Sequence, residues 1–246
     1  MAISNIEIWA VIPAAGIGSR MQAAIPKQYL PLLGSTVLDI SLSKILCALP
    51  LAGVVVSLNS HDTWWQYSRF ASHPKVFTCA GGKERADSVL NALSSIATLS
   101  SAAPSQQAWV LVHDAVRPCV ESARIAGLVK ACIDLGIGGI LATPVADTLK
   151  KLNSCKRIVD TLDREHVWQA HTPQFFPYRQ LRHALEYCLL KQLPVTDEAS
   201  AIEQKGAEVR VHADRRDNIK ITLPEDLPWA EYILQQQKFS AELKCV

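Results

Sequence analysis

Short apolar runs alternate with segments of helical period along most of the chain. Apolar runs typical of β-strands cover residues 7–12, 53–58, 75–79, 108–113, 139–145, 208–213 and 219–222. Apolar residues recur every three or four positions in 84–99 and 121–136, and helices are also predicted after Pro177, in 196–206 and after Pro224. Nearly all-apolar strands that alternate with helices predict an α/β fold, with a mainly parallel sheet covered by helices on both faces.

Residues 146–176 interrupt this alternation. Two stretches of roughly alternating polarity flank a turn signal at Asn153–Ser154. This pattern predicts a β-hairpin arm over about 147–176 that projects from the main sheet. The sequence shows no linker, low-complexity segment or internal repeat, and residues 1–246 are therefore predicted to form a single domain.

Helix-end signals support two of the predicted helices. Gly136 suits the C-terminal end of the helix in 121–136. In 196–206, Thr196 is placed to cap the helix and Gly206 to end it.

The composition of the chain disfavours several classes of function. Hydrophobic residues make up 49% and charged residues 20%, which is typical of a globular protein. A net charge of +2 without a Lys/Arg-rich block gives little support to nucleic-acid binding. No apolar run approaches the ~18 residues of a membrane span, and the N-terminus shows no targeting signal. The 7 cysteines form no CxxC motif, so we expect reduced thiols in a cytoplasmic protein without membrane contact.

The stretch WAVIPAAGIGSRM ends a predicted strand in a loop of small residues. Ligands of open α/β sheets bind beyond the carboxyl ends of the strands, and small residues let a polyphosphate approach the backbone N–H groups. The alternative is a tight strand–helix connection that uses its glycines only for the turn. Arg20 then offers a fork for phosphate oxygens and Lys27 a point charge, although a solvated lysine is the commoner explanation for a residue like Lys27. Pro26 fixes the backbone before Lys27 and favours a positioned lysine.

Two phosphate-binding motifs are absent at this loop. There is no GxxxxGK[ST], and Met21 stands where GxGxxG requires its third glycine. Asp39 lies in a helical-looking run and does not end a second strand, as the acidic residue of a dinucleotide site would. A dinucleotide-binding oxidoreductase is therefore disfavoured.

A set of motifs in fixed order identifies a family resemblance. The motifs are PAAGIGSRM, PKQYLPLLG, GGKERADSV, VHDAVRPCV, PVADTLKK, TLDREHVWQAHTPQFF, TDEASA and DNIKITLPEDL. Each is weak alone, but together they closely resemble the 2-C-methyl-D-erythritol 4-phosphate cytidylyltransferase family. The resemblance implies a Rossmann-like nucleotidyltransferase fold, Mg²⁺, and a homodimer built through an exchanged β-arm. The implied partners are CTP and a small polyol phosphate, which react to give the CDP-alcohol and pyrophosphate.

The resemblance also implies roles for individual residues. Arg20 and Lys27 match the catalytic cations that stabilise the transition state. The implied nucleotide-binding residues are Pro13, Ala14, Ala15, Gly16, Gly18, Gly82, Ser88, Asp114 and Ala115. The implied polyol-phosphate residues are Arg117, Thr148, Arg164, Thr172 and Lys220, with Arg164 and Thr172 supplied by the partner's arm. Lys83 departs from the acid that some members carry near the base.

Two aspartates are candidate metal ligands. Asp114 ends an apolar strand at the expected ligand edge, where its carboxylate could hold a hard cation such as Mg²⁺. A loop-bracing or helix-capping role is the alternative for Asp114. Asp217, close to Lys220, is the second candidate.

The chemistry requires cations and no base. The attacking phosphate is already an anion, and two unit charges 4 Å apart repel by about 4 kcal/mol at an effective dielectric near 20. Positioning and charge neutralisation therefore dominate. We accordingly expect His113 to pack or hydrogen-bond beside its strand and Arg117 to brace the Asp114 loop.

Two alternatives stay open at this point. A ribitol-5-phosphate cytidylyltransferase would share the opening loop and differ in the polyol pocket. A catalytically silent nucleotide-binding module is disfavoured because Arg20, Lys27 and Lys220 are all present.

Overall fold

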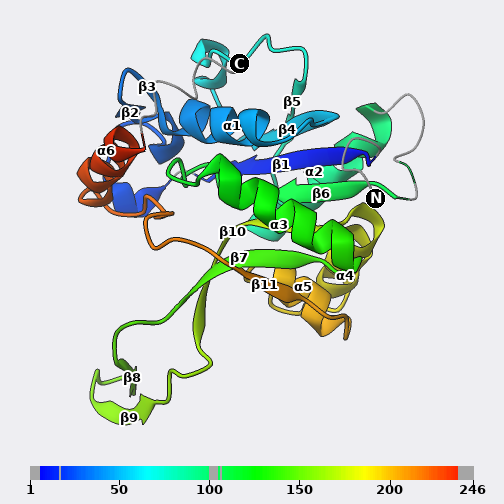
Figure 1. The fold of residues 1–246 in the computed structure, drawn as a ribbon. Helices are drawn as coiled ribbons and strands as arrows, with labels where there is room; N and C mark the ends of the chain where they lie inside the picture. The colour runs from blue at the N-terminus through cyan, green and yellow to red at the C-terminus, as the bar shows by residue number, and fades with distance from the viewer. Residues whose placement is uncertain (1–5, 17, 100–104, 106, 238–246) are drawn as a thin grey trace.

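The computed structural model describes residues 6–16, 18–99, 105 and 107–237. The main sheet of this part of the chain has the strand order β11 (Arg210–Ala213), β7 (Gly139–Pro144), β10 (Trp168–Pro177), β6 (Trp109–Val112), β1 (Ile8–Ala14), β4 (Gly53–Leu58) and β5 (Val76–Ala80). Only β10 runs antiparallel to its neighbours, β6 and β7, and the other pairs are parallel. The predicted mainly parallel sheet is confirmed (Figure 1).

Helices cover both faces of this sheet, as predicted (Figure 1). One face packs against α1 (Val37–Ala48) and α3 (Ser122–Leu135). The other packs against α2 (Arg85–Leu99), α4 (Tyr178–Leu190) and α5 (Glu198–Gln204). A third cluster joins α6 (Asp226–Gln236) to the edge formed by the short strands β2 (Pro31–Leu32) and β3 (Ser35–Thr36). In the described part of the chain, no helix has the length and apolar character to span a bilayer.

Strand β1 shows why its sequence is apolar without interruption. Its side chains alternate, so that Ala10 and Ile12 pack with α1 and α3, whereas Trp9 and Val11 pack with α2 and α4. All four residues are buried. A strand covered on both faces has no solvent side and needs no polar residues.

The helix-end predictions are confirmed in part. Gly136 ends α3 in the left-handed region with φ 68°, as a C-terminal glycine should. Helix α5 is capped by Asp197, whose carboxylate accepts the N–H of Ser200, and not by Thr196. Thr196 lies one residue too early, and its own N–H donates to the Ser200 hydroxyl.

Two segments differ from the prediction. Residues 219–222 form no strand, because Ile219 and Ile221 are apolar for another reason, which is their packing in the α6 cluster. Strand β10 was predicted to belong to the arm. It lies instead inside the main sheet, where Phe175 packs on one face and Phe176 on the other.

The arm itself is shorter than the predicted 147–176. It consists of β8 (Leu149–Leu152) and β9 (Ile158–Leu162), which pair antiparallel and project from the body of the molecule (Figure 1). The predicted turn is present, since the Asn153 side chain accepts the N–H groups of Cys155 and Arg157. Residues 168–176 are excluded from the arm because β10 pairs with β6 and β7.

Candidate active site

A cavity of about 380 Å³ lies at the carboxyl ends of β1 and β6, beside the start of α2. This is the edge of an α/β sheet at which ligands bind. Twelve of the predicted site residues line it: Pro13, Ala14, Ala15, Gly16, Gly18, Arg20, Lys27, Gly82, Ser88, Asp114, Ala115 and Lys220. The three cations expected to act together, Arg20, Lys27 and Lys220, therefore surround one space.

Two side chains hold the small-residue loop at the end of β1. The Gln28 side chain donates to the Ala14 carbonyl over 2.7 Å, and the Asn59 side chain to the Ala15 carbonyl over 3.2 Å. Two carbonyl oxygens of the loop are thereby occupied. A ligand in the cavity then meets the loop chiefly through N–H groups, which suit an anion.

Close approach explains two glycines at this site. A Cβ on Gly81 would stand 2.2 Å from the Ala15 Cβ, so the Gly81–Gly82 loop rests directly on the β1 loop. A Cβ on Gly18 would stand 2.8 Å from the Lys27 Cγ, and Gly18 also has a φ of +69°. Gly18 thus makes room for the stem of Lys27.

Lys27 is a positioned lysine. Its Nζ donates to the Ile221 carbonyl over 3.0 Å. Burial, followed by the charges of Lys220 and Arg20, lowers the pKa of Lys27 from its ordinary 10.5. An anionic ligand would offset the part of this shift that the two neighbouring cations cause.

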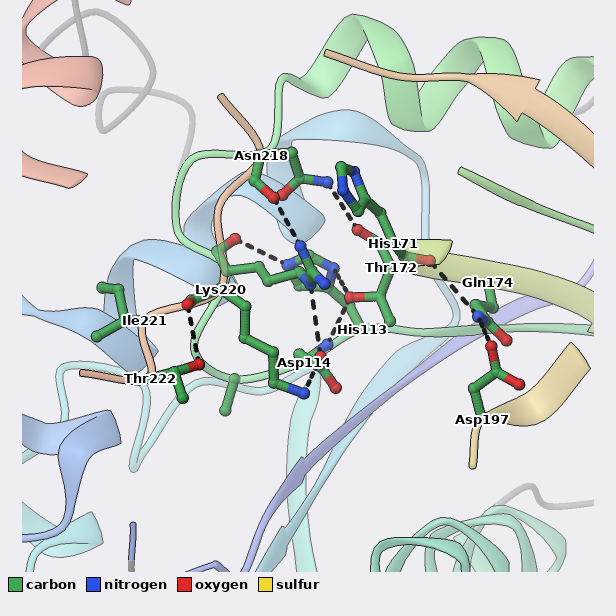
Figure 2. A network of polar contacts seen from close by, with 12 residues as sticks. His113, Asp114, His171, Thr172, Gln174, Asp197, Asn218, Lys220, Ile221 and Thr222 are labelled. Carbon is green, nitrogen blue, oxygen red and sulfur yellow. Dashed lines mark hydrogen bonds and ion pairs between the residues drawn. The ribbon is translucent and has the colours of Figure 1, made fainter. Parts of the chain in front are cut away.

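Asp114 is surrounded by three cations. Its Oδ1 accepts from Arg85 Nε at 3.1 Å. Its Oδ2 lies 2.8 Å from Lys220 Nζ (Figure 2). Arg117 Nε lies 3.5 Å from Oδ2, which is ion-pair distance without an aligned hydrogen bond. Burial works to raise the pKa of Asp114, but Arg85, Lys220 and Arg117 outweigh it and hold the pKa well below its usual range.

A buried polar layer supports Asp114 from behind. The Thr172 hydroxyl accepts the Asp114 N–H at 3.0 Å and lies 3.0 Å from His113 Nδ1, whose ring contacts the Arg117 carbonyl through Nε2 (Figure 2). Burial lowers the pKa of His113 to about 4, so its imidazole is neutral near pH 7. Arg117 also donates to the Asn218 carbonyl over 2.6 Å. His113 hydrogen-bonds beside its strand, as predicted, and the contacts of Arg117 with Asp114 and Asn218 agree with the predicted bracing of the Asp114 loop.

The structure corrects the placement of Thr172. It was predicted to come from the partner's arm, but it lies in β10, buried beneath its own subunit's Asp114. Between Ala170 and Gln174 the ladder with β7 shifts register, and this irregularity frees Thr172 to turn toward Asp114.

Four other predicted residues do not line the cavity. Arg117 lies behind Asp114, and Thr148 and Arg164 are exposed beside the arm, where Arg164 Nη1 donates to the Ala146 carbonyl. Asp217 pairs with Arg215 at 2.7 Å and lines a separate cavity near α6. The expectation that Asp217 joins Asp114 is therefore not supported.

Sequence reasoning missed Arg85, Glu198 and Gln28. Arg85 lines the cavity and joins Asp114 to the buried Glu198, while Gln28 holds the β1 loop. Arg85 and Glu198 lie in GGKERADSV and TDEASA, among several other polar residues, and neither motif signals locally that the two residues pair.

Asp114 is a candidate carboxylate ligand for a magnesium ion. Asp114 Oδ1 accepts a single hydrogen bond, which leaves it a lone pair. In the described ranges no group of three or more His, Cys, Asp or Glu side chains could hold a metal. Mg²⁺ commonly binds one or two carboxylates together with substrate phosphates, and Asp114 fits that pattern.

Comparison with known proteins assigns a family. Residues 8–236 match the family described as 2-C-methyl-D-erythritol 4-phosphate cytidylyltransferase. Proteins of that name from Pseudomonas putida (strain GB-1) and Vibrio vulnificus (strain YJ016) are 50% and 44% identical to the chain. They align over 90% and 97% of it and over 93% and 99% of their own lengths. The crystal structure of the enzyme of that name from Francisella tularensis superposes with a TM-score of 0.78 at 36% identity, covering 93% of this chain and 100% of that one.

The contact between Gly81 and Ala15 predicts a selective binding defect. Gly81→Ala should displace the β1 loop and weaken the binding of CTP, the expected nucleotide, about tenfold or more, because its Cβ overlaps Ala15. Titration calorimetry with CTP measures the effect. Gly138→Ala is the matched control, since its Cβ would lie 2.1 Å from the Phe176 ring at the opposite edge of the sheet. Equal loss of CTP affinity in both variants would contradict the prediction.

Proposed function

The chain belongs to the 2-C-methyl-D-erythritol 4-phosphate cytidylyltransferase family, and from this membership we propose how the residues of its cavity divide the work. The enzyme transfers CMP from CTP to 2-C-methyl-D-erythritol 4-phosphate. An oxygen of the methylerythritol phosphate attacks the α-phosphorus of CTP, the bond from the α-phosphorus to the bridging oxygen breaks, and pyrophosphate leaves. The family membership does not favour the ribitol-phosphate alternative.

The observation that carries this proposal is the gathering of Arg20, Lys27 and Lys220 around the small-residue loop. Two anionic reactants must be held together against their repulsion, and fixed cations in a partly buried site do this without reorganising. The loop binds the β- and γ-phosphates of the leaving pyrophosphate. Arg20 and Lys27 stabilise the charge that grows at the α-phosphate, and Lys220 holds the incoming phosphate.

We propose Asp114 as the protein ligand of Mg²⁺. Its free Oδ1 lone pair supports this, and the remaining ligands would be phosphate oxygens and water. When bound, the ion would withdraw negative charge from the phosphates. Arg117 supports the site by bracing Asp114, and Thr172 by holding its backbone N–H.

We further propose a homodimer in which each arm reaches the partner's cavity. The arm exposes apolar side chains, with Leu152 50% and Ile158 63% exposed, which favours burial against another chain. Arg164 follows β9 and is exposed, so it is available to a neighbouring site, and Thr148 lies on the same arm. The 7 cysteines of the chain form no CxxC motif, which supports a cytoplasmic location.

A substrate panel tests the reaction. Pyrophosphate release should be fastest with CTP and methylerythritol phosphate, and at least about tenfold slower with ribitol phosphate, because a built site rejects misplaced hydroxyls. Each nucleoside triphosphate is offered with each polyol phosphate. Faster release with ribitol phosphate would overturn the assignment.

Removal of the Lys27 side chain should lower kcat more than it weakens the binding of CTP. Lys27→Ala should lower kcat roughly 100-fold or more, because a charge-stabilising donor is lost in the transition state, while Kd for CTP changes less than about tenfold. Stopped-flow turnover and calorimetry measure the two quantities. An unchanged kcat would contradict the role.

The pH profile gives Lys27 a second readout. Protonated Lys27 is lost as pH rises through its lowered pKa, so kcat/KM for CTP should fall at a pH below 10.5. Lys27→Arg stays protonated and should lack this alkaline limb. Persistence of the limb in Lys27→Arg would assign it to another group.

Mixed dimers test the shared site. In a dimer of one Lys27→Ala and one Arg164→Ala subunit, one cavity combines an intact Lys27 with the partner's intact Arg164. Random mixing should then restore about a quarter of wild-type activity, since half of the dimers are mixed and each has one intact site. Doubly tagged mixed dimers as inactive as their parents would exclude the exchanged arm.

A further inference from the structure

An ion pair joins Arg85, which lines the cavity, to the buried Glu198, and neither residue has been assigned a role above. Glu198, at the start of α5, is only 1% exposed, and its carboxylate accepts both Arg85 Nη1 at 2.6 Å and Nη2 at 3.0 Å. The Nε of the same guanidinium donates to Asp114 at 3.1 Å. Arg85 therefore joins α5 to the end of β6 and contacts the carboxylate that holds Lys220.

Glu198 is fixed relative to β6. The Gln174 amide donates to the Asp197 carboxylate over 2.8 Å and accepts the Ala199 N–H over 2.9 Å (Figure 2). Gln174 lies opposite Val112 in the β10–β6 ladder, two residues before Asp114. The start of α5 is thus clamped to the same two strands that carry Asp114 and Thr172.

The pairing uses the guanidinium in a specific way. A guanidinium favours bidentate pairing with a carboxylate, and Arg85 has two carboxylates within reach. Glu198 accepts hydrogen bonds from both Nη atoms of Arg85, and Asp114 accepts one from Nε. Asp114 Oδ2 is therefore left for Lys220, at 2.8 Å.

We propose that Glu198 is a positioning residue. Because Glu198 binds both Nη atoms of Arg85, the guanidinium does not pair bidentately with Asp114. Asp114 can therefore hold Lys220 toward the cavity. Without the Glu198 charge, the Arg85 guanidinium pairs bidentately with Asp114 and displaces Lys220 from that carboxylate. The proposal rests on the assigned role of Lys220 in holding the incoming phosphate.

The first test is Glu198→Gln, which keeps the shape and removes the charge. The value of kcat/KM for methylerythritol phosphate should fall about 10- to 100-fold, the range of a lost hydrogen bond to a charged group. Kd for CTP should change less than about threefold. Ser200→Ala is the matched control, because it removes half of the α5 cap without touching Arg85. It should lower the free energy of unfolding and leave kcat/KM unchanged.

The decisive comparison removes the arginine. Arg85→Gln has no guanidinium that could pair with Asp114. Adding Glu198→Gln to it should therefore change kcat/KM less than about threefold. The double variant should also be more active than Glu198→Gln alone. The double variant leaves neither Arg85 nor Glu198 as an unpaired charge, so its kcat/KM can be compared with that of the wild type even where a single variant does not fold. A further tenfold loss in the double variant, or an equal loss in Ser200→Ala, would overturn the proposal. Wild-type protein inactive with CTP and methylerythritol phosphate would instead refute the assigned reaction.

Discussion

The carboxylate of Asp114 is the interaction on which the site depends. Three cations from different parts of the chain, Arg85, Arg117 and Lys220, converge on it at distances of 2.8 to 3.5 Å. A buried carboxylate without such partners would be strongly disfavoured, and so would the cations without it. Asp114 therefore links α2, β6 and the segment before α6 into one wall of the cavity, and each of them is held in place by the same charge.

The topology explains why these groups can meet. Strands β1 and β6 run in parallel, so their carboxyl ends deliver the small-residue loop and Asp114 to the same edge. Strand β10 runs the other way beside β6 and brings Thr172 and Gln174 under that edge. One antiparallel strand thus adds a polar supporting layer that a fully parallel arrangement would place elsewhere.

Local signals predicted much of the fold and the main cations. The spacing of apolar residues and the residues typical of helix ends located most helices and strands. The loop of small residues, followed by Arg20 and Lys27, indicated a phosphate site. Strand β10 was missed because its polar residues, including His171 and Gln174, resemble an exposed hairpin. In the fold they are buried against Asp214 and Asp197. The Arg85–Glu198 pair spans 113 residues of sequence, and no local pattern reports such a contact.

The cations of the cavity lie where a polyanion would meet them, and their protein partners are unequal. Lys220 pairs with the charge of Asp114, whereas Lys27 donates to the Ile221 carbonyl, and burial, followed by the nearby charges of Lys220 and Arg20, lowers the pKa of Lys27. The cavity thus retains an excess of positive charge that the fold does not neutralise. Repulsion among these cations lowers the stability of the folded protein, but the same cations favour the binding of a triphosphate. Such a loss of stability is expected at a functional site. Asp114 limits the excess, and the surrounding buried network limits how far Asp114 can move.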